Sequence, residues 1–265
     1  MSGFSAQWLA LREPADAGSR NVELTTRLIE WRRTQERLSV LDLGSGTGAN
    51  YRFLAPLLGG EQSWRLVDND PALFTPQTAF QHAPLERCCL DLATDRDRLD
   101  FRDMQLVSAS ALIDLVSAAW LEWLARRCRE AQAAVFMVLT YDGTLVWQPA
   151  LPDDATVCAW LNRHQCTDKG FGPALGPQAA PTLKTLLESL DYRVELRPSP
   201  WRLGAAQTAL QAALLDGWVE AVNEIAPDAA DWLDAWAMQR RCWMEQGQSR
   251  LQVGHWDLFA AGKAV

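Results

Sequence analysis

The feature that most constrains this chain is a short apolar segment that leads directly into three alternating glycines. The run reads Val40-Leu41-Asp42-Leu43-Gly44-Ser45-Gly46-Thr47-Gly48, and a helical pattern resumes over 51–58. Glycines at alternate positions let the backbone adopt positive φ and let a ligand approach closely. In doubly wound sheets, ligands bind at the carboxyl ends of the strands, where this loop falls. The segment therefore predicts a ligand-binding strand–loop–helix unit.

Strands and helices alternate around this loop. The sequence pattern predicts strands at 39–43, 64–67, 85–90, 104–108, 133–140, 192–196 and 256–260. Strands that alternate with helices indicate a parallel sheet covered on both sides. The expected fold class is therefore α/β, with a doubly wound, mostly parallel seven-stranded sheet.

Charge and cysteine usage argue against several classes of partner. Lys and Arg total 25 against 33 Asp and Glu, a net charge of −8, which disfavours binding to the phosphate backbone of a nucleic acid. The six cysteines form no C-x-x-C pair and the histidines at 82, 164 and 255 are scattered, so we expect free thiols and no metal site. The N-terminal residues lack the pattern of a secretory signal, and the longest apolar run, 133–139, is too short to cross a bilayer. We therefore expect a cytoplasmic protein without a membrane partner.

The glycine loop alone is open to two interpretations. Gly44-x-Gly46-x-x-Ala49 fits the relaxed dinucleotide fingerprint, which brings a pyrophosphate to the N-terminus of the helix. Asp42, however, stands two residues before the first glycine. A carboxylate at that position suits a cationic or hydroxyl-bearing ligand better than a pyrophosphate.

The order of acidic residues along the chain resembles that of the class I S-adenosylmethionine-dependent methyltransferases. An acid followed by G-x-G-x-G spans residues 42–48, a second acid is Asp68 in Leu66-Val67-Asp68-Asn69, and a third is Asp91 in Cys89-Leu90-Asp91-Leu92. The resemblance covers residues 38–140 and, more loosely, the last two strands. It implies a Rossmann-like methyltransferase fold, S-adenosylmethionine as the cofactor and methyl transfer as the reaction.

The resemblance also implies which residues bind the cofactor. The glycine loop would enclose the methionine part, the acid after the second strand would bind the ribose hydroxyls, and the third acid would lie near the adenine. An N-terminal helix covers the cofactor in many relatives, so Arg20 is expected to meet the cofactor's carboxylate, with a helix-capping charge cluster as the alternative. The expected cofactor-binding residues are Arg20, Asp42, Gly44, Ser45, Gly46, Gly48, Asp68, Asn69, Asp91, Leu92 and Ser108.

Signatures of several methyltransferase subgroups are missing. The fourth strand is followed by no [DN]-P-P-[YF] run, no Pro-Cys occurs, and Asp114 alone makes no metal-binding set. Direct in-line transfer to an oxygen or nitrogen of a small polar metabolite remains. The protein's tasks would then be alignment, exclusion of water and removal of a proton.

Candidate catalytic residues crowd into a Gly/Pro-rich stretch after the fifth strand. His164 is the expected general base, because an unperturbed imidazole titrates near neutrality. Asp168 is expected to orient it or bind an amine, and Lys169 to hold a carboxylate or phosphate. The alternative is a turn with a surface histidine and a local Asp–Lys pair.

The chain has no repeat or dividing linker, so we expect a single domain over 1–265. It comprises an N-terminal helical segment at 1–37, a cofactor-binding core at 38–140, an acceptor-site loop at 141–181 and a helical cap at 203–250. The chain has 13 Trp against 8 Phe and 3 Tyr, and Trp232, Trp236 and Trp243 share one face of a cap helix. We expect this stripe to pack in a core rather than to bind a ligand.

Two other functions compete with methyl transfer. One is an NAD(P)-dependent oxidoreductase with a Rossmann domain. The other is a catalytically silent scaffold that binds S-adenosylmethionine. The sequence does not predict the oligomeric state or the methyl acceptor.

Overall fold

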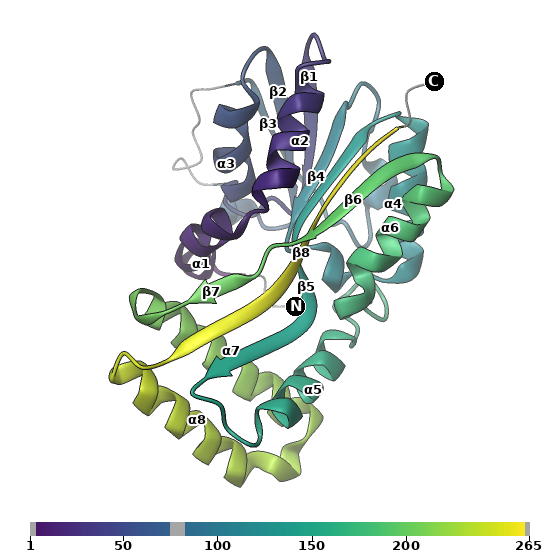
Figure 1. Ribbon diagram of the computed structural model, residues 1–265. Helices are drawn as coiled ribbons and strands as arrows, with labels where there is room; N and C mark the ends of the chain where they lie inside the picture. The colour runs from purple at the N-terminus through teal and green to yellow at the C-terminus, as the bar shows by residue number, and fades with distance from the viewer. Residues whose placement is uncertain (1–3, 75–82, 263–265) are drawn as a thin grey trace.

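A mixed β-sheet forms the centre of the structure, a computed structural model that describes residues 4–74 and 83–262 (Figure 1). The strand order is β3-β2-β1-β4-β5-β8-β6, and β7 pairs with β8 outside this path. Strands β1 to β5 are parallel, whereas β8 runs antiparallel to β5, β6 and β7. The expected doubly wound, mostly parallel sheet is confirmed, with β7 as an additional short strand. The strands are β1 Leu38–Leu43, β2 Gln62–Asp68, β3 Leu85–Cys89, β4 Leu106–Ser110, β5 Ala134–Gln148, β6 Tyr192–Pro198, β7 Trp201–Leu203 and β8 Arg250–Gly262.

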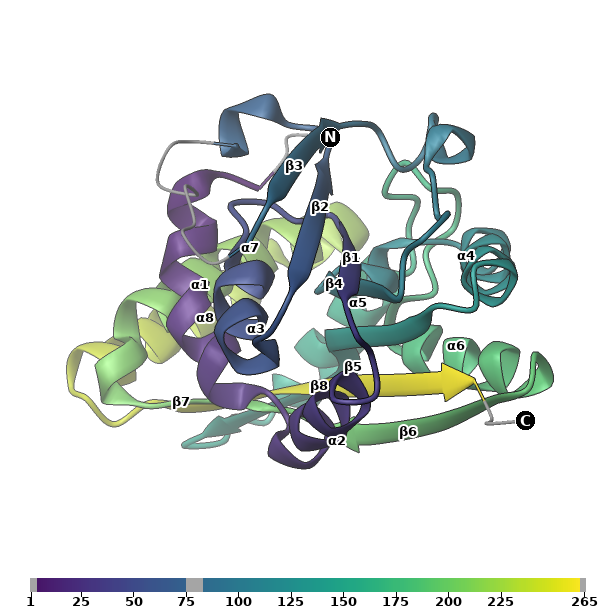
Figure 2. The ribbon, with the colours of Figure 1, turned by 90° about the horizontal axis from the view of Figure 1, so that it is seen from above.

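Helices cover both faces of the sheet. Helices α1, α2 and α3 lie on one face, and α4 and α6 lie on the other (Figure 2). The α-helices are α1 Ala6–Ser19, α2 Val22–Arg32, α3 Ala49–Leu58, α4 Ala118–Glu130, α5 Asp154–Gln165, α6 Ala179–Ser189, α7 Thr208–Ile225 and α8 Ala230–Glu245. Short 3-10 helices are η1 Pro71–Leu73, η3 Arg96–Arg98, η4 Ile113–Leu115, η5 Gly176–Gln178, η6 Ala205–Gln207 and η7 Pro227–Ala229.

The strand–loop–helix unit forms as its residues predict. The four apolar side chains of β1 are at most 1% exposed, as expected of a central parallel strand covered on both faces. Gly44, Gly46 and Gly48 then adopt φ of 61°, 52° and 81°, and Gly48 is the N-cap of α3. Residues with a Cβ rarely adopt this left-handed conformation, so the glycines are what allow the strand to turn into the helix.

Strands β5 and β8 are much longer than the sequence pattern predicts. The register of their pairing shifts between Met137 and Thr140 and again between Tyr141 and Leu145, and pairing then resumes as far as Gln148. The Gly/Pro-rich stretch 141–181, expected to be a loop, therefore contains the end of β5 and the whole of α5. The two strands project beyond the parallel sheet and carry β7 and three helices (Figure 1). We call residues 141–165 and 201–256 the arm.

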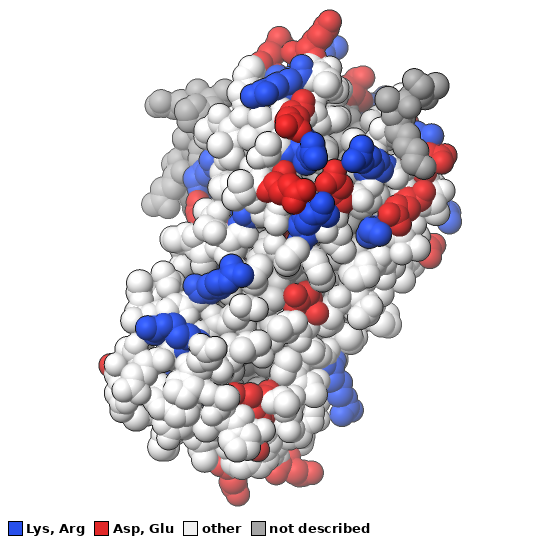
Figure 3. All heavy atoms as spheres, viewed as in Figure 1, with Lys and Arg blue, Asp and Glu red and all other residues white. Residues whose placement is uncertain are grey.

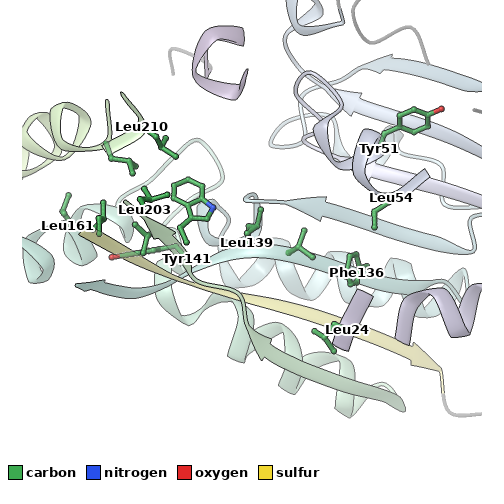
Figure 4. Packing of buried hydrophobic residues seen from close by; sticks show 14 of the residues in the cluster. Leu24, Tyr51, Leu54, Phe136, Leu139, Tyr141, Leu161, Leu203 and Leu210 are labelled. Atoms are coloured by element: carbon green, nitrogen blue, oxygen red, sulfur yellow. The ribbon is translucent and has the colours of Figure 1, made fainter. Parts of the chain in front are cut away.

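Two buried clusters stabilise the fold. One lies under α4 and α6. The other continues from the α2 and α3 side of the sheet into the arm, so that Leu24 and Phe136 belong to the same cluster as Tyr141, Leu203 and Leu161 (Figure 4). Burial of apolar area in one continuous cluster joins the arm to the sheet.

Three tryptophans of the arm pack around one buried cation. The Arg240 guanidinium lies 4.8 Å from the ring centroid of Trp147, 5.6 Å from Trp236 and 5.3 Å from Trp243, and it hydrogen-bonds Asp154. Trp147 also meets Trp236 edge-on at a centroid distance of 6.3 Å. The expected packing in a core is confirmed for Trp236, which belongs to the buried cluster, and for Trp232, which packs against it, while Trp243 contacts the Arg240 guanidinium.

The surface and the cysteines show few special features. Charges of both signs intermingle over the upper part of the face in Figure 3, and the lower part, which belongs to the arm, is largely uncharged.

All six cysteines are free thiols. Within 4–74 and 83–262 no helix is long and apolar enough to cross a membrane, and no cluster of metal-ligating side chains occurs. One of the three histidines considered above, His82, lies outside these ranges.

Candidate active site

The glycine loop is held at the carboxyl edge of the sheet by the neighbouring strand. The Ser45 amide donates to the Val67 carbonyl at 2.9 Å, and the Gly46 amide donates to Asp68 Oδ2 at 2.7 Å. The other oxygen of Asp68 accepts from the Asp70 amide at 3.1 Å. Burial raises the pKa of Asp68 above its usual range. The structure therefore places this carboxylate directly against the loop.

Asp42 and Ser108 lie beneath the loop rather than on its surface. They occupy paired positions on β1 and β4, and both side chains are fully buried. The Asn50 amide nitrogen donates to Asp42 Oδ1 at 2.7 Å and to Ser108 Oγ at 2.7 Å. Burial raises the pKa of Asp42 to about 7. These two residues, predicted to bind the cofactor, thus fasten α3 to the sheet.

Asn50 was not identified from the sequence. The available signal is a polar residue in the first turn of α3 at a position that faces the core, where it is 3% exposed. Buried amides need hydrogen-bond partners, so a buried Asn one turn after a glycine loop indicates polar groups on the strand below it.

The third acid and its neighbours lie along the same edge. Cys89 pairs with Asp68 in the parallel register of β3 and β2, and Asp91 follows two residues later. The Asp91 carboxylate accepts from the Ala93 amide at 2.8 Å and shapes the turn that follows β3. The Leu92 carbonyl accepts from the Trp120 indole at 2.8 Å, while the side chain of Asn69 is exposed. The sheet thus brings the second and third acids to adjacent strand ends.

Arg20 is buried just beyond the end of α1. Its Nη2 donates to Ser110 Oγ at 3.3 Å, and its guanidinium lies 5.2 Å from the Phe53 ring centroid. Its Nε and Nη1 are buried and have no hydrogen-bond partner. Burial lowers the pKa of Arg20, and the charges of three nearby carboxylates, with Asp257 foremost, oppose that shift. Unpaired buried donors are costly, which makes this guanidinium a candidate site for an anionic group.

Asp257 of β8 organises the backbone around Arg20. Its Oδ1 accepts from the Leu139 amide at 2.8 Å and from Ser199 Oγ at 2.6 Å, and its Oδ2 accepts from the Asn21 amide at 2.8 Å. Leu139 has a φ of 55° at the first register shift of β5. No sequence motif marks Asp257, because its partners come from three distant segments.

Helix α1 covers the glycine loop. A Cβ added to Gly46 would lie 2.9 Å from Leu9 Cδ1, so the helix approaches the loop as closely as a glycine permits. Glu13 binds Arg52 of α3 at 2.6 Å, and Arg52 also donates to the Thr47 carbonyl at 2.7 Å. Arg12, Glu13 and Asp16 are part of α1, which extends to Ser19.

The expected position of His164 in a loop is wrong, because the residue lies in the last turn of α5. Its Nε2 lies 3.0 Å from the exposed carboxylate of Glu224 on α7, and Lys169 Nζ lies 3.4 Å from both ring nitrogens. Asp168 accepts instead from the Gly170 and Gly172 amides, at 2.6 and 3.0 Å. The expected orienting contact between Asp168 and His164 does not occur among the described hydrogen bonds.

The loop that follows α5 does approach the active-site edge. The Leu175 amide donates to the Val116 carbonyl at 2.9 Å, just after β4. The catalytic role of His164, Asp168 and Lys169 stays a prediction. Their present contacts stabilise the loop and the α5–α7 interface.

A second group of buried polar and aromatic side chains lies where the arm leaves the sheet. It was not identified as a site from the sequence, because its members come from five elements and share no motif. Trp201 and His255 have ring centroids 4.9 Å apart, and the Arg12 guanidinium lies 5.0 Å from the Trp201 centroid. We call this group the root cluster: Arg12, Asp16, Asp114, Tyr141, Trp201 and His255.

Comparison with solved structures identifies the fold, whereas the sequence itself matches no family model and no curated protein. A cyclopropane-fatty-acyl-phospholipid synthase-like protein from Lactobacillus casei is 13% identical, with a TM-score of 0.55 over 97% of this chain and 94% of that chain. The YcgJ protein from Bacillus subtilis is 12% identical, with a TM-score of 0.50 over 92% of this chain and 100% of that chain. The Rossmann-like fold of the class I methyltransferases, implied by the order of the motifs, is thereby confirmed.

Proposed function

We propose that this chain is an S-adenosylmethionine-dependent methyltransferase that acts on an oxygen or nitrogen of a small polar metabolite. The observation that carries the proposal is Arg20, a buried guanidinium with two unpartnered donors beside the sheet edge that bears the glycine loop. A protein-only environment leaves such donors unpaired at considerable cost, and a ligand carboxylate would satisfy them.

The residues at this edge fit the parts of S-adenosylmethionine. Arg20 would hold the carboxylate of its amino-acid part, and the glycine loop would let that part approach the backbone. Asp68, already against the loop, would accept from the ribose hydroxyls, and Asp91 would lie near the adenine. When bound, this cofactor supplies a methyl group activated by a positively charged sulfur.

The chain's own contribution is alignment and the exclusion of water. Helix α1 covers the loop through Leu9 and is tied to α3 by the Glu13–Arg52 pair. Holding two reactants in line removes much of the entropic cost of a bimolecular step. A water-excluded site also strengthens the interactions of the charged groups inside it.

The buried acids favour this function over a nicotinamide-dependent oxidoreductase. Asp68 lies against the loop where a dinucleotide would place its pyrophosphate, and Asp42 adds a second carboxyl group beneath that loop. A cationic ligand with vicinal hydroxyls suits that charge better.

Isothermal titration with S-adenosylmethionine, S-adenosylhomocysteine and NAD tests the proposal. We expect both sulfur ligands to bind and Arg20→Met to weaken them by about 10- to 100-fold, the range for a lost charge-assisted hydrogen bond. Arg126→Met, which replaces an exposed arginine of α4, is the matched control. Binding of NAD alone would overturn the proposal. Cofactor binding without transfer of a radiolabelled methyl group to any component of a metabolite extract would identify a silent scaffold.

A further inference from the structure

The root cluster joins five elements next to the glycine loop. Tyr141 and His255 are paired residues on β5 and β8, with ring centroids 6.4 Å apart, and Trp201 on β7 adjoins His255. Asp114 lies on η4, which packs against β5, and Arg12 lies on α1. Burial raises the pKa of Asp114 and lowers the pKa of His255, and the nearby charge of Arg12 acts on both groups, which places all three side chains in one electrostatic neighbourhood.

The cluster lies beside the proposed cofactor site. A Cβ on Gly44 would lie 3.1 Å from Leu112 Cδ1, and Leu112 is the residue immediately before η4. Arg12 stands about two turns before Arg20 on the same helical segment. The charge of Arg12 also acts on Arg20 and lowers its pKa. The glycine loop, Arg20 and the root cluster therefore form one continuous region.

The hydrogen-bond donors of the cluster named here already have acceptors within the protein. Arg12 donates to both oxygens of Asp16, at 2.9 and 3.2 Å, and the Trp201 indole donates to Asp16 Oδ1 at 3.1 Å. Tyr141 Oη donates to Asn162 Oδ1 at 2.9 Å. These donors are engaged, so they do not select an anionic ligand.

Two acceptors of the cluster, by contrast, have no partner. Asp114 Oδ1 and His255 Nδ1 are buried and unpaired, on side chains only 8% and 5% exposed. A neutral imidazole that carries its proton on Nε2 has a lone pair on Nδ1 and can accept an N–H there. Burial lowers the pKa of His255 to about 3, so the ring stays neutral at physiological pH. Unpaired buried acceptors are as costly as unpaired donors.

A site with two free acceptors, engaged donors and aromatic walls selects a ligand that brings several N–H groups. A hydroxyl offers one donor and a carboxylate or phosphate offers none, whereas a protonated amine offers two or three. An ammonium group is also stabilised by a carboxylate and by the faces of aromatic rings.

We propose that the root cluster is the acceptor site, that the acceptor is a small primary or secondary amine, and that Asp114 takes its proton while His255 Nδ1 accepts a second N–H. This inference rests on the proposed function and specifies its substrate class. The Asp114 carboxylate takes a proton from the ammonium, and the electron pair of that N–H bond stays on nitrogen. This pair forms the new C–N bond as the carbon–sulfur bond of the methyl donor breaks and leaves its electrons on sulfur. The product is the N-methylated ammonium, and the proton on Asp114 passes to solvent.

The ionisation of Asp114 supports this role. Burial raises the pKa of Asp114 to about 6. A general base with a pKa near the working pH both accepts and releases its proton readily.

Titration of the protein alone with three matched probes tests the inference without a cofactor. The probes are propylammonium, 1-propanol and propionate, and the readout is the Trp201 indole N–H signal in a nitrogen-15 correlation spectrum, assigned with Trp201→Phe. We expect propylammonium to shift this signal more strongly than the other two probes. Asp114→Asn should weaken propylammonium at least about tenfold, because it removes the charge from a charge-assisted contact. The exposed Asp216→Asn serves as the control and should bind like the wild type.

His255→Phe is the second variant, because it keeps an aromatic ring and removes the acceptor. We expect it to weaken propylammonium binding about threefold or more. Preference for propanol or propionate, or wild-type affinity in both variants, would overturn the inference. Titration of the same variants with S-adenosylhomocysteine separates the two proposals. Intact cofactor binding with no amine preference refutes only the acceptor site. An amine preference without cofactor binding refutes the proposed function and leaves the root cluster as an amine-binding site.

Discussion

One buried arginine lies beside the glycine loop and another lies in the arm, and the two differ in how many hydrogen-bond partners the protein supplies. Arg240 in the arm is bound by Asp154 and the Pro149 carbonyl and is surrounded by three indole rings. Arg20, beside the glycine loop, makes one long hydrogen bond, 3.3 Å to Ser110, and has two unpartnered nitrogens. Both guanidiniums are buried, but the protein itself supplies most of the partners of only one. The comparison separates a cation used for packing from a cation positioned for a ligand.

The largest expected effect is a loss of stability when the buried arginine of the arm loses its carboxylate partner. Asp154→Ala should lower the free energy of unfolding by about 3–5 kcal/mol, because removing one partner of a buried ion pair leaves the other charge uncompensated. The Trp236 indole would also lose its hydrogen bond to the same carboxylate, at 2.8 Å. Urea denaturation measures the change, with Asp216→Ala as the exposed control. A loss below about 1 kcal/mol would show that Arg240 is not anchored by this pair.

Arg20→Met removes the guanidinium beside the glycine loop and should hardly change the stability of the protein. We expect the free energy of unfolding to change by less than about 1 kcal/mol, because replacing a poorly paired buried charge by an apolar side chain is often neutral. Cofactor affinity should fall as described above. The same urea measurement checks the stability, and a loss as large as that of Asp154→Ala would make Arg20 a structural residue.

The buried carboxyl group of Asp42 beneath the glycine loop makes the free energy of unfolding depend on pH. Burial raises the pKa of Asp42 to about 7, against about 3.9 for an unfolded chain. The folded state therefore binds this proton more tightly, so the stability it contributes is fully present below about pH 4 and is lost as the pH rises through about 7. Asp42→Asn should flatten the decline in unfolding free energy between about pH 4 and 7, measured by urea denaturation at a series of pH values. An unchanged slope would mean that Asp42 is ionised throughout this range.

The smallest expected effect concerns the α5–α7 contact. His164→Ala removes a hydrogen bond to a side chain that is 71% exposed, so the loss in unfolding free energy should stay below about 0.5 kcal/mol. Thermal unfolding measures it. Methyl transfer by the same variant distinguishes the two candidate bases, because a loss of about 100-fold would return that role from Asp114 to His164.

The residues around the glycine loop can be predicted from the sequence because each of their motifs is a contiguous run. The residues of the loop, the acid that ends β2 and the acid that follows β3 are read from contiguous runs, and strand order brings them together without further information. Asp42 belongs to the run that leads into the glycine loop and Ser108 to the fourth strand. Whether their side chains face a ligand or α3 depends on the packing of Asn50. That packing has no contiguous signature.

The arm and the root cluster could not be predicted in the same way. Asp142 and Gly143 indicate a turn, yet they lie within β5 because the residues on both sides of them pair with β8, a strand more than 100 residues away. The partners of Asp257 and His255 likewise come from distant segments, and an isolated polar residue in an apolar strand does not indicate its partners. Pairing between strands far apart in sequence, rather than residue preference, decides this half of the structure.

Strands β5 and β8 pass without a break from the parallel sheet into the arm, and Tyr141 and His255 lie on that passage. Amide hydrogens on the two sides of this passage should therefore share opening events, since local unfolding involves contiguous cooperative units. A ligand held between Asp114 and His255 would have to dissociate before such an opening. Occupancy of the cluster should thus slow hydrogen exchange in α7 and α8, two helices that contribute no residue to it.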